Sequence, residues 1–298
     1  MTSRAGVWIQ TSRPLGVALV WITLYAAVSG VIAIGLTQTC ALAAARSGVA
    51  LPDQFSPWFL AALAPCWVIG FGAATWLVGA RLAKQSWTEL GWRPEGGTAR
   101  ALVRGCAVGA MAAALAVTLA IVPGGARLRF AHHWSAYLSV AGPIALGLLA
   151  AALAEELAFR GFPLRRLARA LGAWRATGFL ALLFGMTHLM NPNASVFGLV
   201  NVALAGVWLS VAFFSPGGIV LGWGLHFGWN VGLALLGAPV SGMRLGPPQA
   251  AYHPGPHAWF DGGAFGPEGG LVGTIAIAAG LAALVGSRLR RPQSWVAA

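Results

Sequence analysis

The sequence contains few acidic residues and few charges of any kind. Only seven of its 298 residues are Asp or Glu, one is Lys, and charged residues make up 9% of the chain. A soluble domain carries about 25% charged residues, whereas this chain is 58% hydrophobic. The composition excludes an ordinary soluble domain and indicates a membrane protein.

Cysteine is equally scarce. Cys40, Cys66 and Cys106 lie in or near apolar runs, and no CxxC pair occurs. Cysteines in such positions usually act as small buried apolar side chains, so neither a disulfide framework nor a cysteine metal cluster is expected. The motifs GxSxG, HExxH, Walker A and GxGxxG are also absent, which removes the usual sequence evidence for several hydrolase and nucleotide-binding classes.

Long apolar runs are abundant. About 20 apolar residues, rising about 1.5 Å each, cross the hydrocarbon core of a bilayer. We therefore predict eight transmembrane helices, of which the fifth is short: 14–36, 57–80, 103–123, 137–162, 176–190, 195–215, 217–238 and 269–287. The predicted fold is all-α, a polytopic helix bundle that forms one integral membrane domain over residues 1–298.

The net charge of +12 is unevenly distributed along these spans. Fourteen basic residues fall on the side of the amino terminus, and Arg160 lies within the fourth run. The other four are Arg46, Arg127, Arg129 and Arg244. The positive-inside rule then predicts that both termini are cytoplasmic. This pattern favours contact with the lipid bilayer over nucleic acid, and the excess of Arg over Lys suggests a bacterial inner membrane.

Two connecting segments have a distinct character. Residues 165–175, "RRLARALGAWR", alternate apolar and basic residues at helical spacing and predict an amphipathic helix on the inner face. Residues 239–268 contain six prolines and many glycines. We expect them to form a long and poorly regular outer loop.

Strongly polar groups inside the predicted spans are concentrated on three segments. They are Glu155, Glu156 and Arg160 in the fourth run, His188 in the fifth, and His226 and Asn230 in the seventh. Because such groups are costly inside a membrane, a functional role is the default hypothesis. A rise of about 1.5 Å per residue places them at similar depths, about 14–20 Å from the cytoplasmic surface. We therefore expect a single shared site.

The two adjacent glutamates point about 100° apart on a helix, so we expect different roles for them. Glu156 and Arg160 are four residues apart in the favourable order and predict a structural ion pair. Glu155 is left without that partner, and a desolvated carboxylate can act as a general base near neutral pH. The alternative is a buried network that only stabilises the fold.

His226 and Asn230 are also four residues apart and share a helix face. Gly224 and Gly228 around His226 predict a close approach of a neighbouring helix. A histidine inside a membrane can simply be a hydrogen-bonding group between helices, which is the alternative to a catalytic role.

Three motifs now stand in order: "EELAFR" fits EExxxR, "FGMTH" fits FxxxH, and "HFGWN" fits HxxxN. Together they resemble the CAAX-protease and bacteriocin-processing family of intramembrane metalloendopeptidases. The stretch "TELGWRP" after the second span is similar to a loop of that family. The motifs lie in residues 152–231, and the preceding part of the chain resembles the family mainly in hydropathy.

The resemblance implies helices around a cavity open to the cytoplasm, with the catalytic core in residues 137–238. It also implies cleavage of a membrane-associated peptide or protein near its C-terminus. Glu155 and His188 would activate the attacking water, and His226 and Asn230 would stabilise the oxyanion.

Two alternatives for a metal stay open. Glu155, His188 and His226 match the ligand types of a catalytic zinc site with one open position. Glu155 could equally deprotonate water without a metal, and we favour a reaction that does not require one.

Two other classes of function compete with the protease. A non-catalytic membrane scaffold or bacteriocin-immunity protein could keep the same fold, but the intact polar set favours the enzyme. A transporter with a midplane proton relay would need polar groups reaching both sides, and the first three spans offer almost none.

The topology can be tested with reporter fusions. A reporter placed within residues 46–56 and one at the C-terminus should report opposite sides of the membrane, because basic residues retain their segments in the cytoplasm. The same side for both fusions would contradict the eight-span arrangement.

Overall fold

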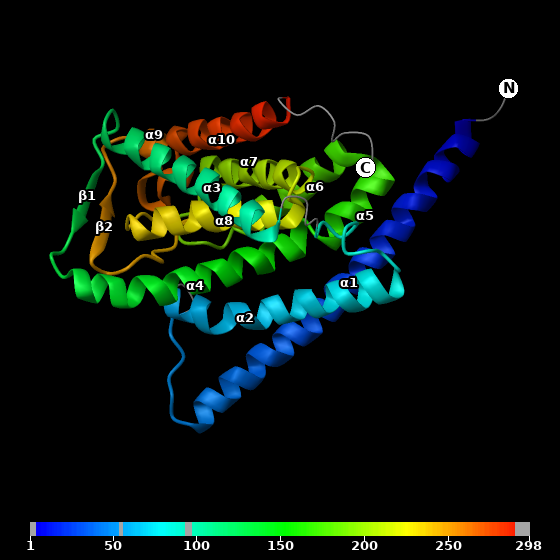
Figure 1. The fold of residues 1–298 in the computed structure, drawn as a ribbon, viewed down its shortest axis with the longest axis horizontal. Helices are drawn as coiled ribbons and strands as arrows, with labels where there is room; N and C mark the ends of the chain where they lie inside the picture. The colour runs from blue at the N-terminus through cyan, green and yellow to red at the C-terminus, as the bar shows by residue number, and fades with distance from the viewer. Residues whose placement is uncertain (1–3, 54–55, 93–96, 290–298) are drawn as a thin grey trace.

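The computed structural model describes residues 4–53, 56–92 and 97–289, and it is dominated by helices that run roughly side by side (Figure 1). Each of the eight apolar runs contains a helix. In chain order these helices and the connecting ones are α1 (Arg4–Arg46), α2 (Pro57–Ala74), which continues as the π-helix η1 (Thr75–Leu82), α3 (Thr98–Ile121), α4 (Trp134–Phe159), α5 (Phe162–Leu171), α6 (Ala173–Met186), α7 (Val196–Phe213), α8 (Gly218–Leu235), α9 (Ala258–Asp261) and α10 (Leu271–Leu289).

Among the described residues, six stretches are long and apolar enough to cross a membrane, so the protein is a polytopic helical membrane protein. They are Pro14–Arg46, Pro57–Leu82, Thr98–Ile121, Trp134–Leu171, Val196–Phe213 and Gly218–Leu235. The apolar helices at Ala173–Met186 and Leu271–Gly286 are shorter, so the number of eight spans stays a prediction. The side of the termini also stays a prediction, and Arg93, Arg290 and Arg291 of its charge count lie outside the described residues.

The segment between α8 and α10 is more regular than the sequence suggested, and the expectation of a poorly regular loop was wrong. Strand β2 (Ala250–His253) pairs antiparallel with β1 (Arg127–Phe130), with Arg127 opposite His253. Short helical turns follow at α9, η2 (Gly263–Phe265) and η3 (Pro267–Gly269), in which Asp261, Phe265 and the three residues of η3 are buried. Glycines at positive φ, such as Gly262 at 85°, permit these tight turns. A high content of proline and glycine is compatible with ordered turns and with irregular chain, so the sequence alone does not distinguish the two.

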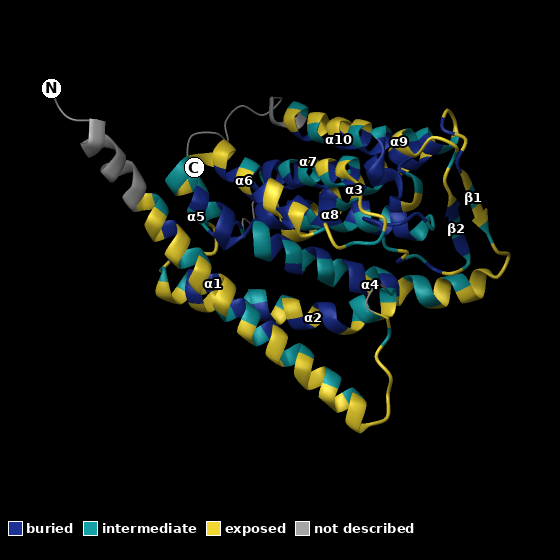
Figure 2. Cartoon of the chain, turned by 180° about the vertical axis from the view of Figure 1, so that it is seen from behind, coloured by how far each residue is buried: buried dark blue, intermediate teal, exposed yellow. Residues whose placement is uncertain are grey.

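Helix α8 lies at the centre of the bundle and is mostly buried, while α1 lies at an edge and is largely exposed (Figure 2). Glycines allow α3 and α8 to touch backbone to backbone, which confirms the close approach predicted at Gly224 and Gly228. A Cβ atom on either residue would lie 2.2 Å from a carbonyl oxygen of α3. A Cβ atom added to Gly105 or Gly109 of α3 would lie similarly close to a carbonyl oxygen of α8, at 2.3 and 2.1 Å respectively. This mutual contact fixes the position of α8, which carries two of the candidate site residues.

Helices α4 and α8 run antiparallel and are tied together by side-chain hydrogen bonds to backbone carbonyls. Tyr137 donates to the carbonyl of Leu235 at 2.8 Å, and Trp223 donates to that of Leu149 at 2.8 Å. The carboxyl end of α4 is therefore held beside the first half of α8.

The amphipathic helix predicted at 165–175 is present as α5, displaced by about three residues. It begins at Phe162–Pro163, since proline suits the first turn of a helix. It ends before Gly172, which has φ of 82°. The helix keeps the apolar face that the sequence predicts, with Leu164 and Leu167 fully buried.

The contact between α3 and α8 can be tested at Gly228. Gly228→Ala should destabilise the protein by about 1–3 kcal/mol, because the new methyl group meets the backbone at Cys106 and the helices must separate. Gly178→Ala is the matched control, since its Cβ atom meets nothing within 4 Å and alanine favours a helix. Thermal unfolding in detergent measures both, and equal midpoints for the two variants would contradict this packing.

Candidate active site

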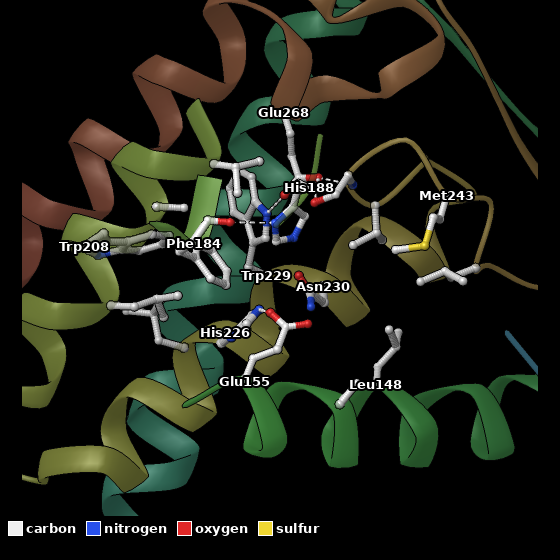
Figure 3. Close-up of a pocket in the computed structure, with 18 of the residues that line it drawn as sticks. Leu148, Glu155, Phe184, His188, Trp208, His226, Trp229, Asn230, Met243 and Glu268 are labelled. Carbon is white, nitrogen blue, oxygen red and sulfur yellow. Dashed lines mark hydrogen bonds and ion pairs between the residues drawn. The ribbon is translucent and has the colours of Figure 1, made fainter. Parts of the chain in front are cut away.

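Four candidate residues from three segments line one cavity of about 60 Å³: Glu155, His188, His226 and Asn230 (Figure 3). Glu155 comes from α4, His226 and Asn230 from α8, and His188 from the turn after α6. A water molecule needs about 10–15 Å³ of this kind of volume. The cavity therefore has room for a few water molecules, and a peptide would require its walls to move apart.

Glu156 is the most buried charge at the site, with 0% of its surface exposed. Its Oε1 lies 3.2 Å from Nη1 of Arg160 and 2.9 Å from Nδ1 of His226. The ion pair that the spacing predicts is therefore present, but the carboxylate has a second partner on another helix. The expectation that Glu156 serves only Arg160 was incomplete, because a contact between helices leaves no trace in spacing along the chain.

Glu155 occupies the opposite side of the same imidazole. Its Oε2 lies 3.7 Å from Nε2 of His226, so the two glutamates face the two nitrogens of one ring. The Glu155 side chain is 39% exposed and borders the cavity, whereas Glu156 does not line it. Within the described part of the chain, Glu155 Oε2 is buried and makes no hydrogen bond. This carboxylate therefore has the capacity to accept a proton from a bound water.

His188 lies in a turn rather than in the helix that the sequence predicted. Helix α6 ends at Met186, and residues 187–190 form turns. Nδ1 of His188 lies 2.9 Å from the carbonyl oxygen of Phe184, which can only accept a hydrogen bond. We therefore assign the proton of the neutral ring to Nδ1, which leaves Nε2 as an acceptor or base. The apolar residues Leu189 and Met190, which follow His188 in this turn, conceal the end of the helix in the sequence.

Phe184 explains the first position of the FxxxH spacing. Its ring is buried and lies edge-on to His188 and His226, with centroids 4.9 and 6.0 Å away. The guanidinium of Arg160 lies over the same ring, 4.3 Å from its centroid. The Phe184 ring therefore contacts both histidines and the buried Arg160 cation, so it links the side chains of the site and does not only fill space.

The orientation of His226 determines what its second nitrogen can do. The contact with Glu156 places a proton on Nδ1, because a carboxylate accepts. Nε2 then points toward Glu155. In the protonated ring, Nε2 carries a hydrogen and can donate to an anionic oxygen. Asn230, one turn further along α8, lines the same cavity and supplies an amide donor.

The donor types of Glu155, His188 and His226 suit zinc, but the arrangement does not gather them as ligands. Among the residues that the structure describes, no three His, Cys, Asp or Glu side chains are close enough to hold a metal ion. His226 also has Nδ1 engaged by Glu156, so it could offer only Nε2. The residues as placed do not fit a three-ligand zinc site, and the requirement for a metal stays untested.

Sequence reasoning missed the far wall of the cavity. It is lined by Val240, Ser241, Met243, Leu245 and Glu268, which all belong to the segment that the sequence predicts to be an irregular outer loop. One signal was available, since Glu268 is one of only seven acidic residues in the chain. The expectation of a cavity open to the cytoplasm stays a prediction.

The comparison with protein families agrees with this geometry. Residues 137–232 match the model of the family described as type II CAAX prenyl endopeptidase Rce1-like. This range runs from within α4 to within α8 and contains all four candidate residues. No curated protein and no solved structure gives a significant match to the chain. The chain therefore contains a domain of the Rce1-like type II CAAX prenyl endopeptidase family, and this membership implies that it is a protease.

Proposed function

We propose that the protein is an intramembrane endopeptidase that hydrolyses a peptide bond of a membrane-associated protein or peptide. The observation that carries this proposal is the state of Glu155. Its Oε2 is buried, has no hydrogen-bond partner in the described residues, and belongs to a side chain that borders the cavity with both histidines. A carboxylate in that condition is poised to bind and deprotonate a water molecule.

The reaction can be written with the groups of this chain alone. Glu155 accepts one proton of the water while Nε2 of His188 accepts a hydrogen bond from the other. The water oxygen then forms a bond to the peptide carbonyl carbon, and the carbonyl oxygen becomes an oxyanion. When the carbon–nitrogen bond breaks, Glu155 returns its proton to the leaving nitrogen, so that the atoms and charges balance.

His226 and Asn230 are suited to stabilise the oxyanion. Both lie on α8, whose position is fixed by the glycine contacts with α3 and by the hydrogen bonds to α4. Donors that are held in place before the reaction contribute several kcal/mol to such a step. Glu156 supports this role, because it orients the His226 ring and compensates its charge when the ring is protonated.

The position of the cavity supports this class of substrate. The cavity is enclosed by helices that cross the membrane and by the segment after α8, and leucine, valine, tryptophan and methionine side chains supply much of its wall. A substrate must therefore reach it from the membrane or from its surface. This requirement favours a peptide that is anchored to or embedded in the bilayer.

The first test compares cells that carry the wild-type protein with cells that carry Glu155→Ala. Membrane proteomics should show one or a few membrane-associated proteins that stay uncleaved in the variant, because water activation by a general base typically contributes about 10²–10⁴-fold to the rate. Identical peptide termini in both strains would favour the non-catalytic scaffold or immunity protein.

The second test separates the two glutamates. Glu155→Gln should abolish cleavage while the protein stays folded and abundant. Glu156→Gln should lower the free energy of unfolding by about 3–5 kcal/mol, because it leaves the buried Arg160 guanidinium without its anion. Thermal unfolding in detergent and the cleavage assay together measure the two effects. The reverse pattern, with unfolding by Glu155→Gln alone, would show that the roles are exchanged.

A third test concerns the metal. If the chain's own groups carry the reaction, cleavage by the purified protein should survive dialysis against a chelator, since Glu155 acts directly on water. Loss of cleavage that is restored by added zinc would contradict this part of the proposal.

A further inference from the structure

A second carboxylate, that of Glu268, is buried and borders the cavity at the end opposite to Glu155 (Figure 3). It is 6% exposed and accepts three hydrogen bonds. Oε1 accepts from Nε1 of Trp229 at 2.6 Å, and Oε2 accepts from the backbone N–H of Ser241 and from its Oγ, the latter at 3.0 Å. The indole N–H, the backbone N–H and the hydroxyl all donate to Glu268, and an ionised carboxylate, which only accepts hydrogen bonds, matches this set of donors.

The backbone of Glu268 is held as well as its side chain. Asn201, on α7 and fully buried, donates from Nδ2 to the carbonyl oxygens of Glu268 and Gly270 at 2.8 and 2.9 Å. Thr274 of α10 donates to Oδ1 of the same amide at 2.8 Å. The carboxylate is therefore presented to the cavity from a position fixed by two helices.

The Ser241 side of this cluster leads to the turn that carries His188. Asn191 donates from Nδ2 to the carbonyl oxygen of Ser241 at 2.9 Å. Gly242 lies against the same turn, since a Cβ atom on it would come within 2.0 Å of the carbonyl oxygen of Pro192. The short segment 240–243 therefore rests directly on residues 191–192, three residues beyond His188.

Ser241 also holds an unusual backbone conformation. Its φ is +46°, in the left-handed region that non-glycine residues seldom adopt. Such a conformation persists only where the surroundings determine it, and it is more frequent at functional sites. The two hydrogen bonds to Glu268 are interactions that hold Ser241 in this conformation.

The Trp229 side of the cluster leads to Asn230. Trp229 is 4% exposed and precedes Asn230 on α8. Its indole also lies edge-on to Trp208 of α7, with centroids 6.1 Å apart. The bond to Glu268 therefore fixes the rotation of α8 at the residue next to the proposed oxyanion donor.

We propose that Glu268 is a positioning residue for the protease reaction, which holds the His188 turn through Ser241 and Asn191 and holds Asn230 through Trp229. This inference rests on the proposed function. Glu156 does the same for His226 at the other end of the cavity, so each histidine depends on a different buried carboxylate. Glu268 itself does not touch the reacting atoms.

The test measures how well the His188 turn is held, independently of cleavage. Purified protein in detergent is treated with diethyl pyrocarbonate, and the modification rates of His188 and His226 are followed by mass spectrometry. Glu268→Gln places an amide N–H against one of the three donors and breaks that bond. The rate at His188 should rise about tenfold, the factor that corresponds to one hydrogen bond to a charged group, while the rate at His226 stays within about twofold.

Asp261→Asn is the matched control. Asp261 lies in the same segment, is fully buried, and accepts backbone N–H groups of Gly255 and Gly263, but it does not line the cavity. It should leave the His188 rate unchanged. Ser241→Ala, which removes only the hydroxyl donor, should give a smaller rise than Glu268→Gln. An unchanged His188 rate in Glu268→Gln, an equal rise in Asp261→Asn, or a parallel rise at His226 would each overturn the proposal.

Cleavage in cells then connects this role to the reaction. Glu268→Gln should accumulate the same uncleaved proteins as Glu155→Ala, and Asp261→Asn should not. If the wild type cleaves nothing, the proposed function fails, yet the modification rates still decide whether Glu268 positions the turn. If the wild type cleaves and Glu268→Gln cleaves equally well, the positioning role is wrong and the protease remains.

Discussion

One carboxylate oxygen, Oε1 of Glu156, receives both the Arg160 guanidinium and the His226 imidazole, and the site depends on this contact. Arg160 is 1% exposed and Glu156 is fully buried, so either charge alone would be costly inside the membrane. Arg160 also follows the last residue of α4, where its backbone closes the helix on the carbonyl of Glu156. The pair of Glu156 and Arg160 therefore marks the carboxyl end of α4, and at this end α4 contacts α8 through His226.

The contact with His226 has a chemical consequence for the neighbouring glutamate. Because Glu156 takes Nδ1, the ring presents Nε2 to Glu155 and to the cavity. Because Glu156 also takes Arg160, Glu155 is left without a cation of its own on α4. In the proposed reaction, Glu156 therefore has a structural role and Glu155 a chemical one, and the difference results from the rotation of about 100° between neighbouring helical residues. The glycine contacts of α8 with α3 make the arrangement possible, since they fix the helix on which His226 is carried.

The sequence predicts the apolar helices and the contacts within a helix, but it does not predict the contacts between distant segments. Apolar runs predicted the positions of the eight apolar helices because a bilayer demands long apolar segments. Spacing of four residues predicted the contact of Glu156 with Arg160, and the GxxxG pair predicted a close helix neighbour. Spacing could not reveal that Glu156 also meets His226, or that α6 ends before His188. Contacts between distant segments depend on how helices rotate and pack, which one sequence does not display.

The burial of Glu268 is also not predictable from the sequence. It lies among prolines and glycines, which predict turns but not whether those turns are buried. Its burial follows from Asn201 of α7, which donates to the carbonyl oxygens of Glu268 and Gly270. The hydroxyl of Thr274 on α10 donates in turn to the Asn201 side chain. The small number of acidic residues in the chain was the one feature of the sequence that singled out Glu268.

The proposed reaction requires that Glu155 activates water beside a His226 ring that Glu156 holds in place. The most direct measurement is an experimental structure of Glu155→Gln with a bound substrate peptide. We expect the scissile carbonyl oxygen to lie about 3 Å from Nε2 of His226 and from the Asn230 amide, with Glu156 still bound to Arg160 and His226. A peptide bound with its carbonyl away from His226 and Asn230, or a Glu156 carboxylate turned into the cavity toward the peptide, would show that these residues do not have the proposed roles.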